Sequence, residues 1–298
     1  RCIGGAPKCG TTTLCHYLST HPEIHFTDPK EPTFYVSSQT GRPACGRNLT
    51  RDQNSDLFRG RGLGQVAGEG STWYLARSKM VAPALQADNS NVRLVFALRD
   101  PIERAYSEYW FQLVHGTIPS GMSFLEATRK PDHWIFDGSK YLENIKTYIR
   151  YFGRDAVCVV TSDDLRHSMS DALAEVCCHI GVDSDHKFPM IPARNVTIYP
   201  RWPKGLAAAG RLLPGVSRYA SGVSRLKGSR VRILFSPDAP KPPMSSQARE
   251  RLQDRYHPEV EELERVLEID LSVWKGDSGA SSRRKASVGV SPNDVKNT

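Results

Sequence analysis

The amino-acid sequence predicts an α/β fold, in which helices flank a P-loop-like, doubly wound parallel sheet. Three observations support this fold class. Short apolar segments alternate with amphipathic helical patterns along most of the chain. The strongest apolar segment, residues 92–98, is almost continuously apolar, which is typical of a parallel strand covered on both faces. A glycine-rich turn also joins the first predicted strand to the first predicted helix.

The first predicted strand ends at Ile3 and Gly4, and the glycine turn leads from it into a helix over residues 11–20. The apolar residues of that helix recur at a spacing that puts them on one face. Residues 66–68 are a weak strand candidate and residues 92–98 a much stronger one, because β-branched and apolar side chains follow one another there.

A helix over residues 102–115 is predicted to follow that strong strand. Asp100 is a good N-cap, and Pro101 is suited to the first helical position. The remaining predicted elements are a helix over 140–152, a strand over 156–161, a helix over 163–181, loops with short helices over 186–244 and a helix over 245–271.

The length of 298 residues suits one large domain with a substantial core. We predict that this domain covers residues 1–275. Residues 276–298 are rich in Ser, Gly, Lys and Arg and have no apolar periodicity, so they are predicted to form a disordered tail.

The net charge of +8 favours an anionic ligand or substrate. Nucleic acid, a polyanionic glycan, a nucleotide and an acidic membrane surface all fit that charge, so composition alone does not choose among them. Seven cysteines show no CxxC or Cys/His zinc spacing, and the redox compartment stays open. We therefore expect no bound metal.

The chain contains no apolar run near the ~18–20 residues of a membrane helix, and no secretory signal precedes the first motif. Because the chain opens inside a predicted strand, we expect it to be a fragment, and an upstream anchor is compatible with it. The two sequons at Asn48 and Asn195 matter only in a secretory compartment.

The glycine turn, residues 5–13, presents backbone N–H groups and a helix N-terminus to an anion. Two other interpretations of this turn are a tight turn that binds no ligand and a Walker-type loop that binds a nucleoside triphosphate, G-x-x-x-x-G-K-[ST]. Gly5 and Gly10 have the Walker spacing, but Thr11 stands where the NTPase lysine belongs, and the only lysine of the turn is Lys8. The residue that reaches the β/γ-phosphates of a nucleoside triphosphate is therefore missing.

The stretch APKCGTTTL resembles the 5′-phosphosulfate loop, PKxGTTxL, of sulfotransferases that use 3′-phosphoadenosine 5′-phosphosulfate (PAPS). The resemblance implies that Lys8 contacts the bridging oxygen and the leaving 5′-phosphate. A fixed ammonium at that oxygen favours the transition state, because negative charge grows there as the S–O bond breaks. The other donor-binding residues that the resemblance implies are Cys9, Gly10, Thr11, Thr12 and Thr13.

The stretch LRDPIERAYSEYW resembles the family's 3′-phosphate segment, LRDPxxRxxSxY. The resemblance implies that Arg99 and Ser107 bind the 3′-phosphate, since a guanidinium can grip it with a planar fork and a hydroxyl can add a hydrogen bond. For Arg104 the resemblance implies a structural role rather than phosphate binding. The carboxyl ends of parallel strands are also where this architecture binds ligands.

The stretch DPKEPTFY resembles KEPxFF of the carbohydrate branch, whose glutamate is the expected catalytic base. Glu31 is therefore our candidate base, and Lys30 a candidate for holding sulfuryl oxygens. The next family element, GEKSPxY or GEASxxx, resembles residues 68–74, where Glu69 is a candidate substrate contact and Gly70 replaces a lysine. The second form is typical of enzymes like N-acetylgalactosamine 4-sulfate 6-O-sulfotransferase.

Residues 252–274 resemble the family's closing helix. Just upstream, the heparan sulfate branch completes its 3′-phosphate pocket with a KGRxxP stretch after a disulfide-closed hairpin. Lys227, Arg230 and Lys241 are loose substitutes for that stretch, and we interpret them as a basic, solvated loop.

The resemblance implies a sulfotransferase domain that moves a sulfuryl group from PAPS to a hydroxyl of a carbohydrate, leaving PAP. The acceptor is expected to be an anionic, glycosaminoglycan-like glycan rather than a neutral small molecule, since Lys and Arg are in excess. The resemblance implies no nucleic-acid partner. The alternatives are a P-loop nucleotide kinase or NTPase and a catalytically silent glycan- or nucleotide-binding module. The expected location is the Golgi for a eukaryotic glycoprotein and the cytoplasm for a bacterial protein.

Overall fold

The computed structural model describes residues 2–28, 30–40, 48–115, 117–119, 121–130, 133–191, 199–200, 235–236 and 240–276. Its centre is a five-stranded sheet in the order β2-β3-β1-β4-β5, and every neighbouring pair is parallel. The five strands are β1 (Cys2–Gly5), β2 (Ile24–Phe26), β3 (Val66–Gly70), β4 (Leu94–Leu98) and β5 (Val157–Thr161). The predicted α/β class with a parallel sheet flanked by helices is confirmed.

The strand order reverses at β1, which lies between β3 and β4. The chain therefore leaves β1 toward one edge of the sheet and later returns to build the other edge. At such a switch point the loops after adjacent strands diverge and leave a crevice at their carboxyl ends. The glycine turn after β1 and Arg99 after β4 both lie at this edge, because Gly5 pairs in register with Ala97.

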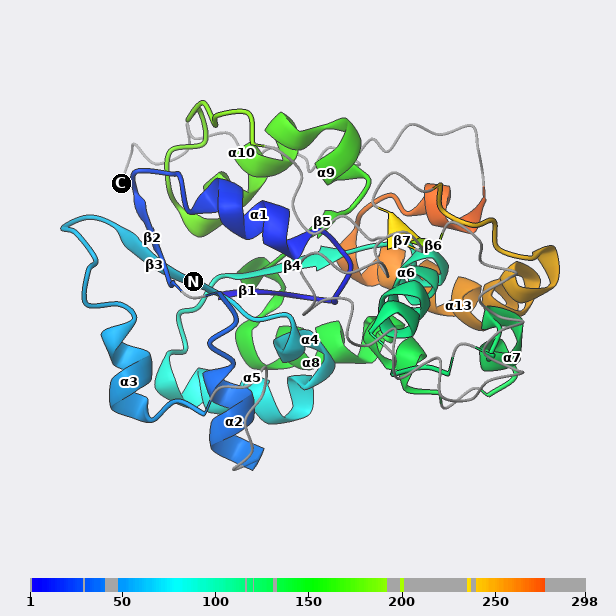
Figure 1. Ribbon diagram of the computed structural model, residues 1–298. Coiled ribbons are helices and arrows are strands. Elements are labelled where there is room, and N and C mark those ends of the chain that lie inside the picture. Colours follow the sequence, from blue (N-terminus) through cyan, green and yellow to red (C-terminus); the bar gives the residue numbers. More distant parts are fainter. Residues whose placement is uncertain are drawn as a thin grey trace.

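Helices cover both faces of the sheet (Figure 1). One face carries α1 (Thr11–Leu18), α9 (Asp164–His167) and α10 (Met169–Ile180). The opposite face carries α2 (Phe34–Thr40), α4 (Trp73–Ala76), α5 (Ser78–Asp88) and α8 (Leu142–Phe152). Beyond the carboxyl edge lie α6 (Pro101–Val114), α7 (Phe124–Thr128), η1 (Trp134–Ser139) and α13 (Ser246–Leu267). Smaller elements are α3 (Arg51–Asp56), η2 (Arg154–Ala156), η4 (Ser272–Lys275) and the antiparallel pair β6 (Tyr199–Pro200) and β7 (Phe235–Ser236).

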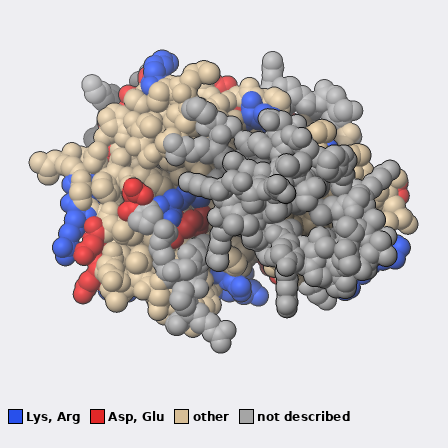
Figure 2. Space-filling model, in the orientation of Figure 1, with Lys and Arg blue, Asp and Glu red and all other residues tan. Residues whose placement is uncertain are grey.

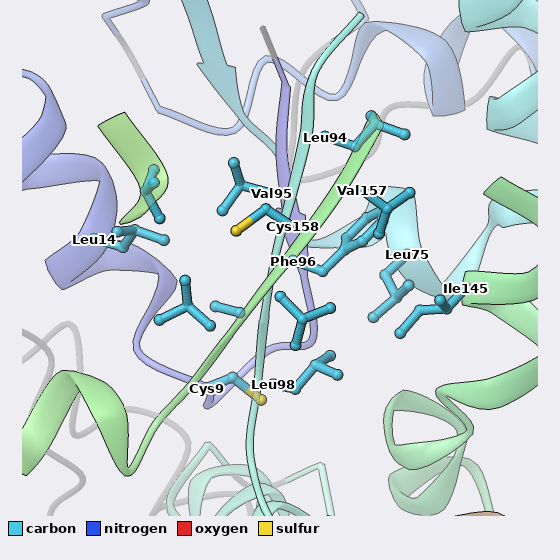
Figure 3. Close-up of a cluster of buried hydrophobic side chains, with 14 of the residues drawn as sticks. Cys9, Leu14, Leu75, Leu94, Val95, Phe96, Leu98, Ile145, Val157 and Cys158 are labelled. Atoms are coloured by element: carbon cyan, nitrogen blue, oxygen red, sulfur yellow. The ribbon is translucent and has the colours of Figure 1, made fainter. Parts of the chain in front are cut away.

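The core fills both sides of the central strands, as the apolar sequence of β4 predicts. Val95 points toward Leu14 of α1, whereas the next residue, Phe96, points to the other side (Figure 3). On that side lies Ile145 of α8, which is fully buried. A strand that is covered on both faces has no solvent side, so its side chains are apolar at every position rather than at alternate ones.

The helix α6 begins as predicted. The Asp100 carboxylate accepts hydrogen bonds from the backbone N–H groups of Ile102 (2.7 Å) and Glu103 (3.2 Å), and Pro101 occupies the first turn. Burial raises the pKa of Asp100 to about 6, although these two hydrogen bonds act in the opposite direction. The cap holds the start of α6 directly after the end of β4.

One predicted element was wrong, and two elements were missed. The single helix expected over 163–181 is two helices, α9 and α10, because the backbone leaves the helical conformation between them at Ser168 (φ −143°, ψ 45°). The helix α5 was missed, since its apolar pattern is weak and Pro83 lies inside it. The strand β2 was missed because it has only three residues.

Most of the predicted loop region 186–244 and residues 277–298 of the predicted tail lie outside the described residues, as do Asn195, Lys227 and Arg230. Within the part of the chain that the structure describes, no helix combines the length and the apolar character needed to cross a membrane.

Candidate active site

The turn between β1 and α1 is built from two special backbone conformations. Gly10, the N-cap of α1, has a φ of 88°, and Lys8 has a φ of 70°. Gly10 adopts this positive φ without strain because glycine has no Cβ. Gly5 is needed for a different reason: a Cβ there would lie 2.7 Å from the Ala97 carbonyl oxygen of the neighbouring strand. The turn is therefore tight against the sheet and ends at a helix N-terminus, which is a site suited to anions.

The side chain of Lys8 reaches across to α6. Its Nζ lies 4.2 Å from the centre of the Phe111 ring, which gives a cation–π contact. Burial lowers the pKa of Lys8, the nearby Glu108 carboxylate raises it, and Arg99 lowers it further. Two of the predicted donor-site cations, Lys8 and Arg99, are thus close enough to repel each other in the absence of an anion.

The Cys9 thiol belongs to the core and not to an anion site. The residue is fully buried, and its Sγ lies 3.8 Å from the Tyr141 hydroxyl, which in turn donates to the Arg99 carbonyl oxygen (3.0 Å). Burial raises the pKa of Cys9 to about 11. Tyr141 therefore connects the glycine turn to the end of β4, and Cys9 contributes packing at this position.

Arg99 and Ser107 lie where the sequence predicts them, at the end of β4 and about two turns into α6. Ser107 is 2% exposed, and the Arg99 side chain is 19% exposed. Thr11, Thr12 and Thr13 form the first turn of α1, and Thr11 is buried. The structure thus brings the predicted donor-binding segments together at one edge of the sheet.

Arg104 is structural, as predicted. It is 1% exposed, its Nε donates to the Ser139 hydroxyl (2.5 Å), and its Nη2 donates to the Ile135 carbonyl oxygen. Its Nη1 also lies 3.9 Å from the Glu108 carboxylate. The guanidinium therefore ties α6 to η1, and this use leaves it facing protein rather than a ligand.

The interpretation of Lys241 as part of a solvated loop was wrong. Its ammonium pairs with the Glu103 carboxylate and lies 5.0 Å from the centre of the Tyr106 ring. Arg249 pairs with the same carboxylate at 2.6 Å, and Arg99 lies 3.8 Å from it. Burial acts to raise the pKa of Glu103, but hydrogen bonds from Lys241 and Arg249 hold it below its usual value. Three cations therefore converge on one carboxylate beside the predicted 3′-phosphate segment.

Glu31 is held in place by several groups at once. Its Oε2 accepts from the Thr72 backbone N–H (2.8 Å), and its Oε1 accepts from the Thr72 hydroxyl (3.1 Å) and from Lys30 Nζ (2.6 Å). Its own backbone N–H donates to the Gly70 carbonyl oxygen (2.9 Å). The backbone of Glu31 has a φ of 63°, a conformation that costs free energy and is frequent at functional sites. The carboxylate has one orientation, as a general base requires.

Sequence reasoning missed Thr72 as the partner of this carboxylate. The available signal was its place in the GEGSTWY stretch, three residues after Glu69. Glu69 itself lies elsewhere: it is 5% exposed and lines a separate cavity of about 470 Å³ with Tyr35, Phe58 and others. Burial raises the pKa of Glu69 to about 7, against a hydrogen bond from Tyr74.

Gly70 lies where the lysine of the GEKSPxY form would crowd two neighbouring side chains. A Cβ on Gly70 would lie 2.6 Å from the Cys15 sulfur and 3.2 Å from the Phe26 ring. The side chains of α1 and β2 have therefore filled the space above this residue. The departure from the lysine-containing form of the motif is explained by packing.

Replacing Gly70 by alanine is expected to lower the free energy of unfolding by about 1–3 kcal/mol, because the added methyl group overpacks the contact with Cys15. Urea unfolding curves measure this change. In a Cys15→Ala background the same replacement is expected to cost clearly less, giving a coupling energy of at least about 0.5 kcal/mol. Additive effects of the two substitutions would contradict the contact.

A cleft of about 980 Å³ adjoins these groups. Pro7 of the glycine turn and Thr72, the partner of Glu31, line one part of it, and Glu108 of α6 lines another. Figure 2 shows that, on the face in view, described basic side chains lie next to acidic ones rather than forming one continuous basic patch. Among the described residues, no three metal-binding side chains come together.

Comparison with known proteins identifies relatives of one kind. The chain is 30% identical over 113 residues to "Membrane-associated sulfotransferase kil1" of Dictyostelium discoideum, covering 37% of this chain and 22% of that protein. It is 29% identical over 147 residues to "Carbohydrate sulfotransferase 15" of Homo sapiens, covering 37% of this chain and 26% of that protein. The chain thus matches about a quarter of the length of these curated relatives. No family model matches it.

A solved structure shares the fold. The crystal structure of a sulfotransferase from Alicyclobacillus acidocaldarius superposes with a TM-score of 0.66 and 23% identity, covering 92% of this chain and 97% of that one. The predicted resemblance to sulfotransferases is confirmed by the curated relatives and by this fold.

Proposed function

We propose that this chain, which has the fold of a sulfotransferase and sulfotransferases as relatives, moves a sulfuryl group from PAPS to a hydroxyl of a carbohydrate. The observation that carries the proposal is the convergence of Lys8 and Arg99 at the carboxyl edge of β1 and β4, next to a helix N-terminus. Two cations beside a helix N-terminus are suited to an anion with several charges, which would compete with Glu103 for Arg99 and with Glu108 for Lys8. The carbohydrate acceptor is supported by the name of the human relative.

In this proposal, the residues of the donor site and the base divide the work. The donor supplies an activated sulfuryl group. Glu31, oriented by Thr72, takes the proton of the acceptor hydroxyl as its oxygen forms a bond to sulfur. Lys8 stabilises the charge that grows on the bridging oxygen as the old S–O bond breaks and PAP leaves. Arg99 and Ser107 hold the 3′-phosphate and so fix the position of the donor.

An assay with radiolabelled PAPS and a panel of carbohydrate acceptors tests the proposal. Transfer of label with release of PAP is expected, and it is expected to persist in EDTA because every group in the scheme is an organic side chain. A protein that hydrolyses or transfers the γ-phosphate of ATP in Mg²⁺, and transfers no label from PAPS, would be a nucleotide kinase or NTPase instead. Binding of PAP with no transfer to any acceptor would identify a silent binding module.

The compartment is part of the same proposal. The Dictyostelium relative is named as membrane-associated. Asn48 of the first sequon is exposed, and the hydroxyl of its Thr50 caps α3 by accepting from the Gln53 N–H. An exposed sequon suits the Golgi lumen of a eukaryotic cell, and a cytoplasmic bacterial enzyme would not use it.

A further inference from the structure

One wall of the 980 Å³ cleft carries an exposed tryptophan beside two cations. Trp73 is 41% exposed, and the guanidinium of Arg77 lies 6.0 Å from the centre of its ring. Lys79 lines the cleft from the next helix. Among the residues that the structure describes, no carboxylate forms an ion pair with Arg77 or Lys79. The wall therefore offers an aromatic face and two uncompensated positive charges.

The other cations of the cleft are already engaged. Arg104 is buried and bonded to η1. Lys140 pairs with Asp137 at 2.8 Å, and Arg255 lies 5.2 Å from the centre of the Phe136 ring. To bind an anionic ligand, Arg104 and Lys140 would have to give up polar partners, whereas neither Arg77 nor Lys79 is in an ion pair within the described part of the chain.

The wall is adjacent to the proposed base. Trp73 directly follows Thr72, whose N–H and hydroxyl hold the Glu31 carboxylate. Consecutive Cα atoms are about 3.8 Å apart. Thr72 and Trp73 both line the cleft, so the aromatic ring and the residue that holds Glu31 belong to the same wall. The cleft volume of about 980 Å³ is at the upper end of the range for ligand pockets, so it has room beyond one ring.

The chemistry of this wall selects a class of ligand. The face of an indole ring carries negative charge density and attracts the polarised C–H groups on the face of a sugar ring. A guanidinium binds the oxygens of a sulfate or carboxylate through two parallel hydrogen bonds, and an ammonium binds them as a point charge. A neutral sugar would use the aromatic face and leave both charges without a partner.

We propose that Trp73, Arg77 and Lys79 form an acceptor subsite in which a sugar ring stacks on Trp73 and a sulfate or carboxylate of the glycan binds Arg77 and Lys79. The subsite rests on the proposed function and deepens it: it selects a glycan that already carries an anionic group close to the hydroxyl that is to be sulfated. Trp134, 43% exposed on another part of the cleft, extends the surface available to the glycan chain.

Direct binding tests the subsite without relying on catalysis. Calorimetry with a sulfated glycosaminoglycan tetrasaccharide, its desulfated form and neutral cellotetraose is expected to show affinity in that order for the wild type. The double variant Arg77→Gln/Lys79→Gln is expected to lose at least about tenfold in affinity for the sulfated probe and to bind cellotetraose unchanged. Trp73→Ala is expected to weaken all three. Arg265→Gln, a substitution of an exposed arginine outside the cleft, is the matched control and is expected to change none.

Transfer kinetics separate this inference from the proposed function. The double variant is expected to raise KM for the sulfated acceptor with kcat retained, to lose the preference over the neutral acceptor and to become less sensitive to salt. Equal loss for sulfated and neutral probes, or a preference for the sulfated probe that survives in the double variant, overturns the subsite. If wild type binds the sulfated probe through these residues but transfers no label from PAPS, the subsite stands and the proposed function fails.

Discussion

Replacing Lys8 by alanine is expected to lower kcat for sulfuryl transfer by about 10²- to 10³-fold, the usual loss for one group that stabilises developing charge. The ammonium lies in the glycine turn and reaches toward α6, where it is partly desolvated. An interaction that strengthens only as the S–O bond breaks affects kcat more than the KM of the acceptor. Steady-state kinetics with saturating PAPS measure both.

The pH dependence gives this prediction a second readout. Burial lowers the pKa of Lys8 below its usual value, so the ammonium form is lost at a lower pH than for an ordinary lysine. The alkaline limb of kcat/KM, which reports the free enzyme, is therefore expected below pH 10.5. The limb of kcat is expected at higher pH, since a bound anionic donor favours the charged form. Lys8→Arg is expected to move both limbs upward.

A matched control for Lys8 is Lys146→Ala. Lys146 pairs with Glu262 at the surface. Its replacement by alanine is expected to leave kcat and the pH profile unchanged. If Lys8→Ala kept kcat within a few-fold of the wild type, stabilisation of the leaving group by this ammonium would be excluded. Equal loss in both variants would point to a general effect on stability.

Replacing Glu31 by glutamine is expected to lower kcat by about 10²- to 10⁴-fold and to leave PAP binding unchanged. Glutamine keeps the shape and can still accept from Thr72, but it cannot take a proton. The loss therefore isolates the proton transfer from the position of the side chain. Single-turnover transfer from labelled PAPS and calorimetric binding of PAP measure the two quantities.

Thr72→Val separates the base from its positioning residue. It removes the hydroxyl hydrogen bond to Glu31 and keeps the backbone one, so a smaller loss of kcat is expected, with the base still visible in the pH profile. The control Glu261→Gln changes an exposed glutamate on α13 and is expected to have no effect. Full activity of Glu31→Gln would remove Glu31 from the mechanism and turn attention to Glu108, the carboxylate that lines the cleft near Lys8.

The local parts of the fold and of the candidate site could be predicted from the sequence. The glycine turn, the cap at Asp100 and the continuous apolar run of β4 are short-range features, because backbone conformation and burial depend on a few neighbouring residues. The positions of Lys8 and Arg99 followed from them, since Arg99 comes directly after β4 and Lys8 lies in the turn after β1, and the two strands end at one edge of the sheet. The helix α5 was not predicted, because Pro83 lies inside it and its apolar pattern is weak.

Contacts between residues that are distant in the sequence were revealed only by the tertiary structure. The sequence by itself determined a parallel α/β sheet and a glycine turn at its carboxyl edge, and its resemblance to KEPxFF indicated Glu31 as the candidate base. The tertiary structure decided that Thr72, 41 residues away, orients Glu31 and that Lys241, 138 residues from Glu103, pairs with that carboxylate. It also decided that Gly70 faces Cys15. The strand order 2-3-1-4-5 brings these segments together, and no local preference of the backbone encodes which distant side chains will meet across it.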